Sequence, residues 1–310
     1  MASPTHTSSV VFQLTEPGSW LENIAVRPDG TLLTTRLDKP ELWLVDPATG
    51  QGSLLLTIPA AKSLTGIAEF EPDRYAIGAG EYNLASGPVP GSWGIWTVDL
   101  TGRTPAVSEV VRIPEVGLLN GLATWDARTV LLADSAVGTI WMVDVRTGRY
   151  EKALSDELMT PPAGSPFPLG VNGVKVQRQA GAQTYVWFTS TARMSFCRVP
   201  VEETACTATG PVEVVGQGFL QDDFCFDGEG AAYVVTNPTN TVVKVTGVGA
   251  EAVVVAGDSH SLELAGGTAC AFGRTEADAK TLYVSTAGGL AMPVNGSETE
   301  PAKIAAIKLD

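Results

Sequence analysis

A pattern of strand-like segments recurs six times along this 310-residue chain, and the repeat limits the possible folds more than any other feature. The segment from Leu21, LENIAVRPDGTLLTTRLDKPELWLVDPATG, matches the segment from Leu119, LNGLATWDARTVLLADSAVGTIWMVDVRTG. Each contains an apolar strand, a turn, two further strands and a closing Thr-Gly turn. Related units begin at Leu64, Val171, Gln221 and Gly267. Their second residues lie 43 to 55 residues apart, a spacing typical of propeller blades.

Six such units predict an all-β fold, a six-bladed β-propeller with four-stranded sheets around a central channel. The 33 glycines and 20 prolines suit many short strands joined by tight turns. Two lone strands at the ends, Ser9–Leu14 and Lys303–Leu309, are expected to share one blade and close the ring. Two packed sandwiches would not predict a sixfold period. We expect a flexible N-terminus over 1–8 and one propeller domain over 9–310.

The second residue of every repeat is polar, although largely apolar alternation follows it. Taken singly, such a residue at a strand start usually bonds nearby backbone. In a propeller, however, these positions lie near one mouth of the channel, where unshared carboxylates and amides are costly. The sequence therefore favours a ring that holds either a divalent cation such as calcium or a polar ligand with water. Its members are Glu22, Thr65, Asn120, Asn172, Asp222 and Thr268.

Charge and motifs exclude several classes of function. A formal net charge of -14 argues against nucleic acid and anionic membranes as partners. No apolar run approaches the roughly 20 residues that cross a bilayer. The two histidines are His6 and His260, and no zinc cluster, P-loop, dinucleotide fingerprint or nucleophile elbow is visible. We expect a monomer that acts on a small molecule.

Two features favour a secreted protein. Cys197 and Cys206 are spaced so that a hairpin-like loop could close them into a disulfide, and two further cysteines make the count even, although all four can equally be buried thiols. Asn295 begins an Asn-Gly-Ser glycosylation acceptor. The polar N-terminus shows no signal peptide, so we expect that one has been removed.

On these motifs the chain resembles the senescence marker protein/gluconolactonase-like propellers, which include regucalcin and bacterial lactonases. The resemblance implies divalent-metal ligands at Glu22 in LENIAV, Asn172 in VNGVKV and Asp222 in QDDFCFDGEG. It places Asn120, in LNGLAT, on the substrate side.

The chain also departs from that family. Asn23-Ile24 stands where the family has Gly-Pro after the first ligand, and Gln221-Asp222-Asp223 replaces Pro-Asp-Gly. These changes keep the ligand oxygens but alter the lactonase pocket.

The amino-acid sequence of the repeats more closely resembles a fungal secreted branch of this superfamily. The segments that carry this resemblance are ENIAVRPDG, ELWLVDP, LLNG, NGVK, DDF and VVTNPTNTVVKV. Members of that branch resemble hetero-Diels-Alderases, which join a tropolone-type quinone methide to a humulene-type terpene. The resemblance implies an enzyme of fungal natural-product biosynthesis.

Two mechanisms fit the predicted ring. In the preferred one, a Diels-Alder cyclisation, the pocket orients a diene and a dienophile. A side chain of Asn120, Asn172 or Thr65 donates a hydrogen bond to the quinone-methide carbonyl. This reaction requires no cofactor. A carboxylic acid could assist loss of water from the precursor. In the alternative, a lactonase, a metal polarises the lactone and Asp222 acts as general base. A third possibility is a propeller that binds a partner without catalysis.

Aromatic residues near the first strands are candidates for an apolar wall beside the substrate. Packing within the blades is the competing explanation for each of them. The candidates are Trp20, Tyr82, Trp93, Phe167 and Phe196.

Overall fold

The computed structural model describes residues 6–178 and 181–309. The chain forms two compact units, one from Met1–Thr65 with Asp222–Asp310 and the other from Gly66–Gln221. Each unit consists of four-stranded antiparallel sheets whose strands follow one another in sequence, apart from the sheet that holds both chain ends. Among the described residues no helix has the length and apolar character needed to cross a membrane.

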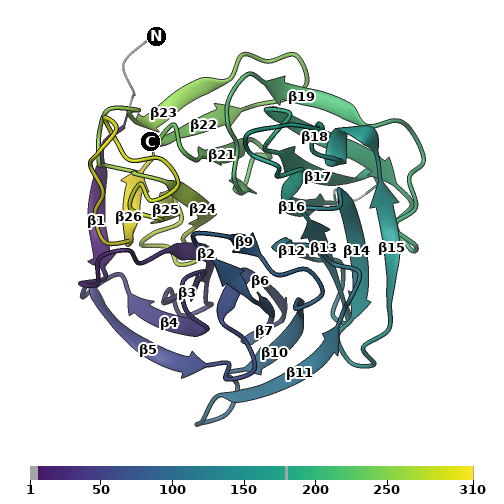
Figure 1. Ribbon diagram of the computed structural model, residues 1–310, viewed down its shortest axis with the longest axis horizontal. Helices are drawn as coiled ribbons and strands as arrows, with labels where there is room; N and C mark the ends of the chain where they lie inside the picture. Colours follow the sequence, from purple (N-terminus) through teal and green to yellow (C-terminus); the bar gives the residue numbers. More distant parts are fainter. Residues whose placement is uncertain (1–5, 179–180, 310) are drawn as a thin grey trace. The chain divides into compact units, whose positions relative to one another are not determined.

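Three sheets make up the first unit (Figure 1). One contains β2 (Leu21–Val26), β3 (Leu32–Arg36), β4 (Glu41–Asp46) and β5 (Gln51–Thr57). The next contains β20 (Phe224–Phe226), β21 (Ala232–Thr236), β22 (Thr241–Val245) and β23 (Val253–Gly257). The third contains β24 (Gly267–Phe272), β25 (Thr281–Thr286), β26 (Lys303–Lys308) and β1 (Ser8–Gln13).

The second unit holds the other three sheets, with most of β6 belonging to it. One contains β6 (Ser63–Glu71), β7 (Arg74–Gly80), β10 (Gly94–Asp99) and β11 (Ala106–Arg112). The next contains β12 (Leu119–Thr124), β13 (Thr129–Asp134), β14 (Thr139–Asp144) and β15 (Tyr150–Ser155). The third contains β16 (Val171–Gln177), β17 (Thr184–Ser190), β18 (Ser195–Val201) and β19 (Glu213–Gln217). A small ribbon of β8 (Tyr82–Asn83) and β9 (Gly87–Pro88) and a 3₁₀ turn, η1 (Glu157–Met159), complete it.

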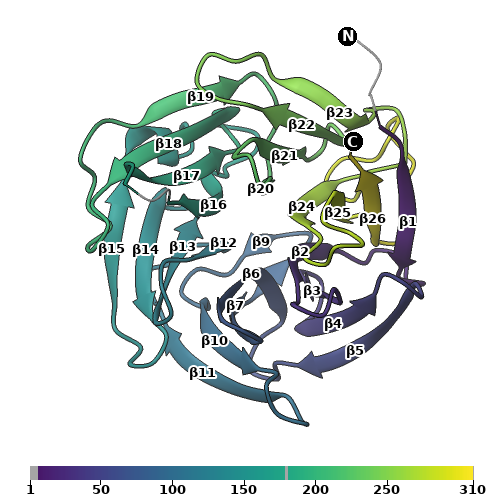
Figure 2. The same ribbon diagram turned by 180° about the vertical axis from the view of Figure 1, so that it is seen from behind.

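Six consecutive four-stranded antiparallel sheets constitute the six-bladed β-propeller fold, as the repeat predicted. The two ends of the chain share one sheet, because β1 pairs with β26 from Ser8 opposite Ile307 to Gln13 opposite Lys303 (Figures 1 and 2). This pairing confirms the predicted closure by the terminal strands. It gives the outer strand of that sheet a partner that is almost the full chain length away in sequence.

The Thr-Gly signature of the repeat forms the turn between the third and fourth strands. In the first sheet the Asp46 carboxylate accepts from the Ala48 backbone N–H over 2.9 Å, and Gly50 has a φ of 70°. In the sheet from β12 to β15, Asp144 accepts from two backbone N–H groups, and Gly148 has a φ of 71°. Aspartate bonds its own turn backbone and glycine adopts a positive φ without strain, so both residue types recur there.

Candidate functional site

Glu22, the second residue of β2, is a buried carboxyl group that an indole holds in place. Its Oε2 accepts a hydrogen bond of 2.6 Å from Nε1 of Trp20, and Trp20 itself is half-buried just before the strand. Burial raises the pKa of Glu22 to about 7, the Trp20 hydrogen bond opposes that rise, and the negative charge of Asp223 adds to it. Burial therefore favours the protonated form of this carboxyl group far more than water would.

Asn23 and Asp223 form a buried pair next to Glu22, although 200 residues separate them in the chain. Nδ2 of Asn23 donates to Oδ2 of Asp223 over 3.0 Å. The remaining oxygens also have partners, because Asn23 Oδ1 accepts from the Ile24 N–H and Asp223 Oδ1 accepts from the Phe224 N–H. Glu22, Asn23 and Asp223 thus gather two carboxyl groups and an amide at one point of the first unit.

The sequence analysis missed the Asn23–Asp223 pair because it aligned only the second residue of each repeat. The third residues are Asn23, Gly66, Gly121, Gly173, Asp223 and Ala269. A Cβ added to Gly66 would come within 2.5 Å of the Asn120 carbonyl oxygen, and one added to Gly121 within 2.5 Å of the Asn172 carbonyl oxygen. Four of these six third residues are glycine or alanine. The large polar side chains of Asn23 and Asp223 at the other two positions are the sequence signal that could have identified the pair.

Asp222 is half-buried rather than buried, unlike its neighbour Asp223. Its Oδ2 accepts from Nδ2 of Asn237 over 3.2 Å, and its backbone N–H donates to the Val235 carbonyl. The backbone N–H of Asp223 donates to the carbonyl of Thr268 in the neighbouring sheet. The structure thus places the deeper carboxylate one residue later than the repeat alignment suggested.

The two threonines at second positions differ in their bonding. Thr268 Oγ1 lies 2.7 Å from the Leu21 carbonyl oxygen and 2.9 Å from Ser285 Oγ, so it ties two sheets of the first unit together. Thr65 Oγ1 is buried without a hydrogen-bond partner, whereas its carbonyl accepts from Thr35 Oγ1. Thr65 has donor capacity that the fold itself does not use.

Three amide side chains, those of Asn120, Asn172 and Gln221, are buried in the second unit. Asn120 and Asn172 are both buried at their strand starts. Asn172 Nδ2 donates to Thr191 Oγ1 over 3.0 Å, and Thr191 in turn donates to the Gln221 carbonyl over 2.8 Å. Asn172 Oδ1 and both polar atoms of the Gln221 side chain are buried without a partner. Such atoms are costly unless a ligand or water meets them, and Gln221 is a further residue that sequence reasoning missed.

The five aromatic candidates fall into two groups. Trp93 and Phe196 have no exposed surface: the ring of Trp93 lies against Gly80, and that of Phe196 packs 5.3 Å from Trp187. Both serve blade packing in the structure. Tyr82 is half-buried against the same apolar cluster as Trp93, while Trp20 and Phe167 are half-buried in loops.

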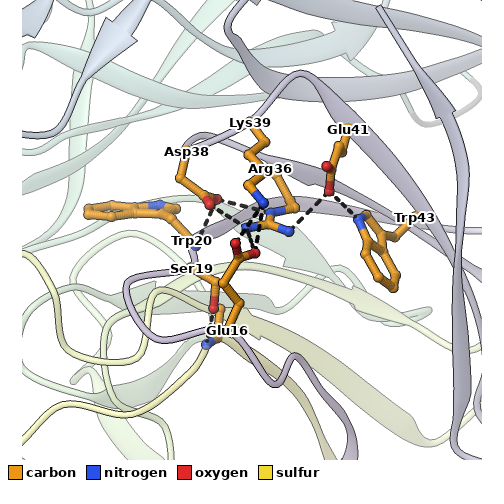
Figure 3. Close-up of polar contacts among 9 residues, drawn as sticks. Glu16, Ser19, Trp20, Arg36, Asp38, Lys39, Glu41 and Trp43 are labelled. Carbon is orange, nitrogen blue, oxygen red and sulfur yellow. Dashed lines mark hydrogen bonds and ion pairs between the residues drawn. The ribbon is translucent and has the colours of Figure 1, made fainter.

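A buried guanidinium supports the segment that carries Trp20 (Figure 3). Arg36, 1% exposed at the end of β3, forms ion pairs with Glu16, Asp38 and Glu41. Asp38 also accepts from the backbone N–H of Trp20 over 2.9 Å. The interactions therefore run from Arg36 through Asp38 to Trp20, and from its indole to the Glu22 carboxyl.

The predicted metal ligands are divided between the two units: Glu22 and Asp222 belong to the first and Asn172 to the second. The carboxylate oxygens of Glu22 and Asp222 accept hydrogen bonds from Trp20 and Asn237, which are N–H donors that compete with a cation. Asn172 Oδ1, an oxygen that calcium favours, is unpartnered but belongs to the other unit. Among the described residues no three His, Cys, Asp or Glu side chains cluster to hold a metal. Occupancy of these residues by calcium stays a prediction.

Of the two alternatives for Cys197 and Cys206, a disulfide or buried thiols, the structure has the buried thiols. Both are free thiols with no exposed surface. Burial raises the pKa of Cys197 to about 11 and that of Cys206 to about 12, so neither ionises readily. Asn295 is exposed at a φ of 52° and exchanges hydrogen bonds with His260, which is also exposed.

Solved structures share this fold. Regucalcin, a calcium-binding protein from Agrobacterium tumefaciens, superposes with a TM-score of 0.67 and 16% identity, over 100% of this chain and 98% of its own. A structure described as a "putative gluconolactonase" gives a TM-score of 0.60 at 12% identity, over 98% of this chain and 92% of its own. The class of fold is therefore the six-bladed β-propeller that these two structures share.

Sequence relatives define the family more narrowly, although no protein-family model matches the chain. A protein of Phoma sp named "Putative hetero-Diels-Alderase" is 30% identical over 301 residues, which cover 86% of this chain and 83% of that protein. A second protein, named "Putative hetero-Diels-Alderase asR5" and from Sarocladium schorii, is 27% identical over 330 residues, which cover 92% of this chain and 79% of that protein. The chain belongs to this hetero-Diels-Alderase family.

Proposed function

We propose that the protein is a hetero-Diels-Alderase that joins a tropolone-type quinone methide to a humulene-type terpene. The observation that carries this proposal is the 30% identity to a relative of that name over 86% of the chain. The first unit supports it, since a buried carboxyl group and an ordered indole suit acid catalysis on an apolar substrate.

The proposed reaction has two steps. A hydroxymethyl precursor first loses water: its C–O bond breaks, the leaving oxygen takes a proton, and the ring hydroxyl releases one, which leaves a quinone methide. The four π electrons of its C=C–C=O unit then combine with two from an alkene. One C–C and one C–O bond form, no atom is lost, and a dihydropyran ring results.

Glu22 is the proposed acid for the first step. Its pKa of about 7 keeps a protonated fraction at neutral pH, and its hydrogen bond to Trp20 fixes the carboxyl group. The neighbouring Asp223 and its partner Asn23 maintain negative charge and polarity beside it. The second step requires orientation more than acid or base, and fixed orientation alone can lower a barrier by several kcal/mol.

Carbonyl recognition is assigned to the amides of the second unit. Asn120, Asn172 and Gln221 are buried, and Gln221 has amide hydrogens without a protein partner. A hydrogen bond to the quinone-methide oxygen lowers the energy of the acceptor orbital and speeds cyclisation. Thr65 offers a further unpartnered hydroxyl.

The test is a cyclisation assay with the purified protein, a tropolone carbinol and humulene, analysed by chiral chromatography with mass detection. We expect one stereoisomer of the adduct in the presence of protein and a racemic trace without it. Dialysis against a chelator should leave the rate unchanged. A racemic product at the uncatalysed rate would contradict the proposal.

A metal-dependent lactonase is the second candidate, favoured by the gluconolactonase-like fold and the unpartnered Asn172 Oδ1. It predicts hydrolysis of simple lactones that calcium restores after chelation, with Glu22, Asn172 and Asp222 as ligands. A third candidate, a non-catalytic binding propeller, predicts neither activity. Assaying both reactions on one preparation separates the three.

We also propose that the protein is a secreted monomer of fungal secondary metabolism. The features behind this proposal are the exposed Asn-Gly-Ser acceptor at Asn295 and the net charge of -14, which favours a dispersed protein. Light scattering and glycosidase treatment of protein from a secretory host would test it.

A further inference from the structure

Two cysteines of the first unit face each other across neighbouring sheets. Cys225 lies on β20 and Cys270 on β24, and their sulfur atoms are 3.3 Å apart. A disulfide bond is about 2 Å long, so closure needs an approach of about 1.3 Å. The two strands are already joined nearby, because the Asp223 N–H donates to the Thr268 carbonyl over 3.0 Å.

The two thiols differ in access. Cys270 is 4% exposed, and its sulfur contacts the Tyr233 carbonyl. Cys225 is half-buried, which leaves it open to a small reagent. Cys225 is therefore the thiol that can react first with a small disulfide. Cys270 can then displace the small thiol from the resulting mixed disulfide.

We propose that Cys225 and Cys270 form a reversible disulfide that joins β20 to β24 beside the carboxyl cluster. The oxidant is a small-molecule disulfide such as oxidised glutathione. The Cys225 thiolate attacks one of its sulfurs, a mixed disulfide forms, and one glutathione thiolate leaves. The Cys270 thiolate then attacks the Cys225 sulfur and expels the second glutathione. The protein loses two protons and two electrons, and the oxidant becomes two glutathione molecules.

The disulfide would affect the carboxyl cluster of Glu22 and Asp223 by joining β20 to β24. Cys225 lies two residues after Asp223, and Cys270 two residues after Thr268, so both cysteines are close in sequence to the backbone hydrogen bond that joins Asp223 to Thr268. A covalent link at this place restrains the spacing of the strands that position Asp223. The inference does not depend on the proposed reaction, because thiol chemistry is measured without substrate.

The test exposes the reduced full-length protein to oxidised glutathione under native conditions and then alkylates the remaining thiols. A glutamate-specific protease separates the cysteines, since cleavage after Glu213, Glu229, Glu263 and Glu276 puts Cys225 in 214–229 and Cys270 in 264–276. We expect these peptides to appear linked, lighter than their sum by two hydrogen atoms. The thiol count should fall from four to two and return to four with dithiothreitol.

Matched controls come from the chain itself. Cys197 and Cys206 should remain unmodified, since both are fully buried thiols. In Cys270→Ser, Cys225 should stop at the glutathione adduct, which shows that Cys270 is the resolving thiol. Absence of the linked peptide in the wild-type protein, a wild-type glutathione adduct on Cys225 that never resolves, or equal oxidation of Cys197 and Cys206 would each overturn the proposal.

Discussion

Nε1 of Trp20 donates a hydrogen bond to Oε2 of Glu22 over 2.6 Å, and this contact links the loop before β2 to the carboxyl group at its start. The backbone of Trp20 is in turn fixed by Asp38, which is ion-paired to the buried Arg36. A half-buried indole held at two points is a suitable support for an acid, because the donor keeps its direction.

The pKa of Glu22 predicts a decline of activity with rising pH. If Glu22 delivers a proton, kcat/KM should be highest below about pH 7 and fall above it, as the group ionises. Glu22→Gln should lower the rate of the dehydration step and abolish this limb of the profile. A Gln variant with the wild-type profile would assign the proton to another group.

The same group makes stability depend on pH. The folded state keeps the Glu22 proton up to about pH 7, whereas the unfolded chain releases it near the ordinary value of 4.5. The folded state therefore binds more protons between these values, and the free energy of unfolding should fall as pH rises through them, by at most about 3 kcal/mol. Urea titrations at several pH values should show this slope in the wild type and its loss in Glu22→Gln.

Trp20→Phe should shift the pH profile of kcat/KM to higher pH. The indole hydrogen bond lowers the pKa of Glu22, whereas burial raises it. Without the indole donor the pKa should therefore rise further, and the alkaline limb of the profile should move to higher pH. Trp93→Phe is the matched control, because Trp93 is fully buried in packing and its change should affect stability alone. Identical limbs in the wild type and Trp20→Phe would show that the indole does not act on this carboxyl.

Asn23→Ala should destabilise the protein by about 1.5 to 3 kcal/mol, since it removes a hydrogen bond to the buried Asp223 carboxylate. The two residues share this contact, so adding Asp223→Ala should cost less than its effect in the wild type. Urea midpoints of the two single variants and the double variant measure the coupling. Strict additivity would mean that the pair does not interact.

Arg36→Met should cost about 3 to 5 kcal/mol, because it leaves Asp38 and Glu41 with negative charge and no buried cation. Lys39→Met is the matched control: Lys39 pairs with Glu16 at the surface, and its loss should cost no more than about 1 kcal/mol. Thermal unfolding of both variants gives the comparison. Equal effects would show that burial of the guanidinium does not matter here.

Gln221→Met should separate binding from stability. Both polar atoms of Gln221 are buried without a partner, so a side chain of similar size should keep or raise the free energy of unfolding. If the amide meets the substrate carbonyl, KM should rise or kcat should fall at the same time. A stable variant with unchanged kinetics would remove Gln221 from the site.

Much of the fold was predictable because it depends on short-range patterning. Alternating apolar residues, Asp-x-x-x-Gly turns such as Asp46 to Gly50, and a sixfold period together indicate four-stranded blades. The pairing of β1 with β26 was also predictable, since two lone strands at the ends each lacked a partner. The second positions of the repeats pointed to Glu22 but not to its partners.

The sequence by itself determined the repeat, the strand order within each sheet and the polar residue at each strand start, because these follow from local periodicity and turn chemistry. Tertiary structure alone decided which polar groups meet. Asn23 reaches Asp223 across 200 residues, and Cys225 faces Cys270. Such contacts depend on how neighbouring sheets pack, and a shift of one residue along a strand reverses the side that a side chain faces. Packing thus decided that Asp223, one residue after the predicted Asp222, is the more deeply buried carboxylate.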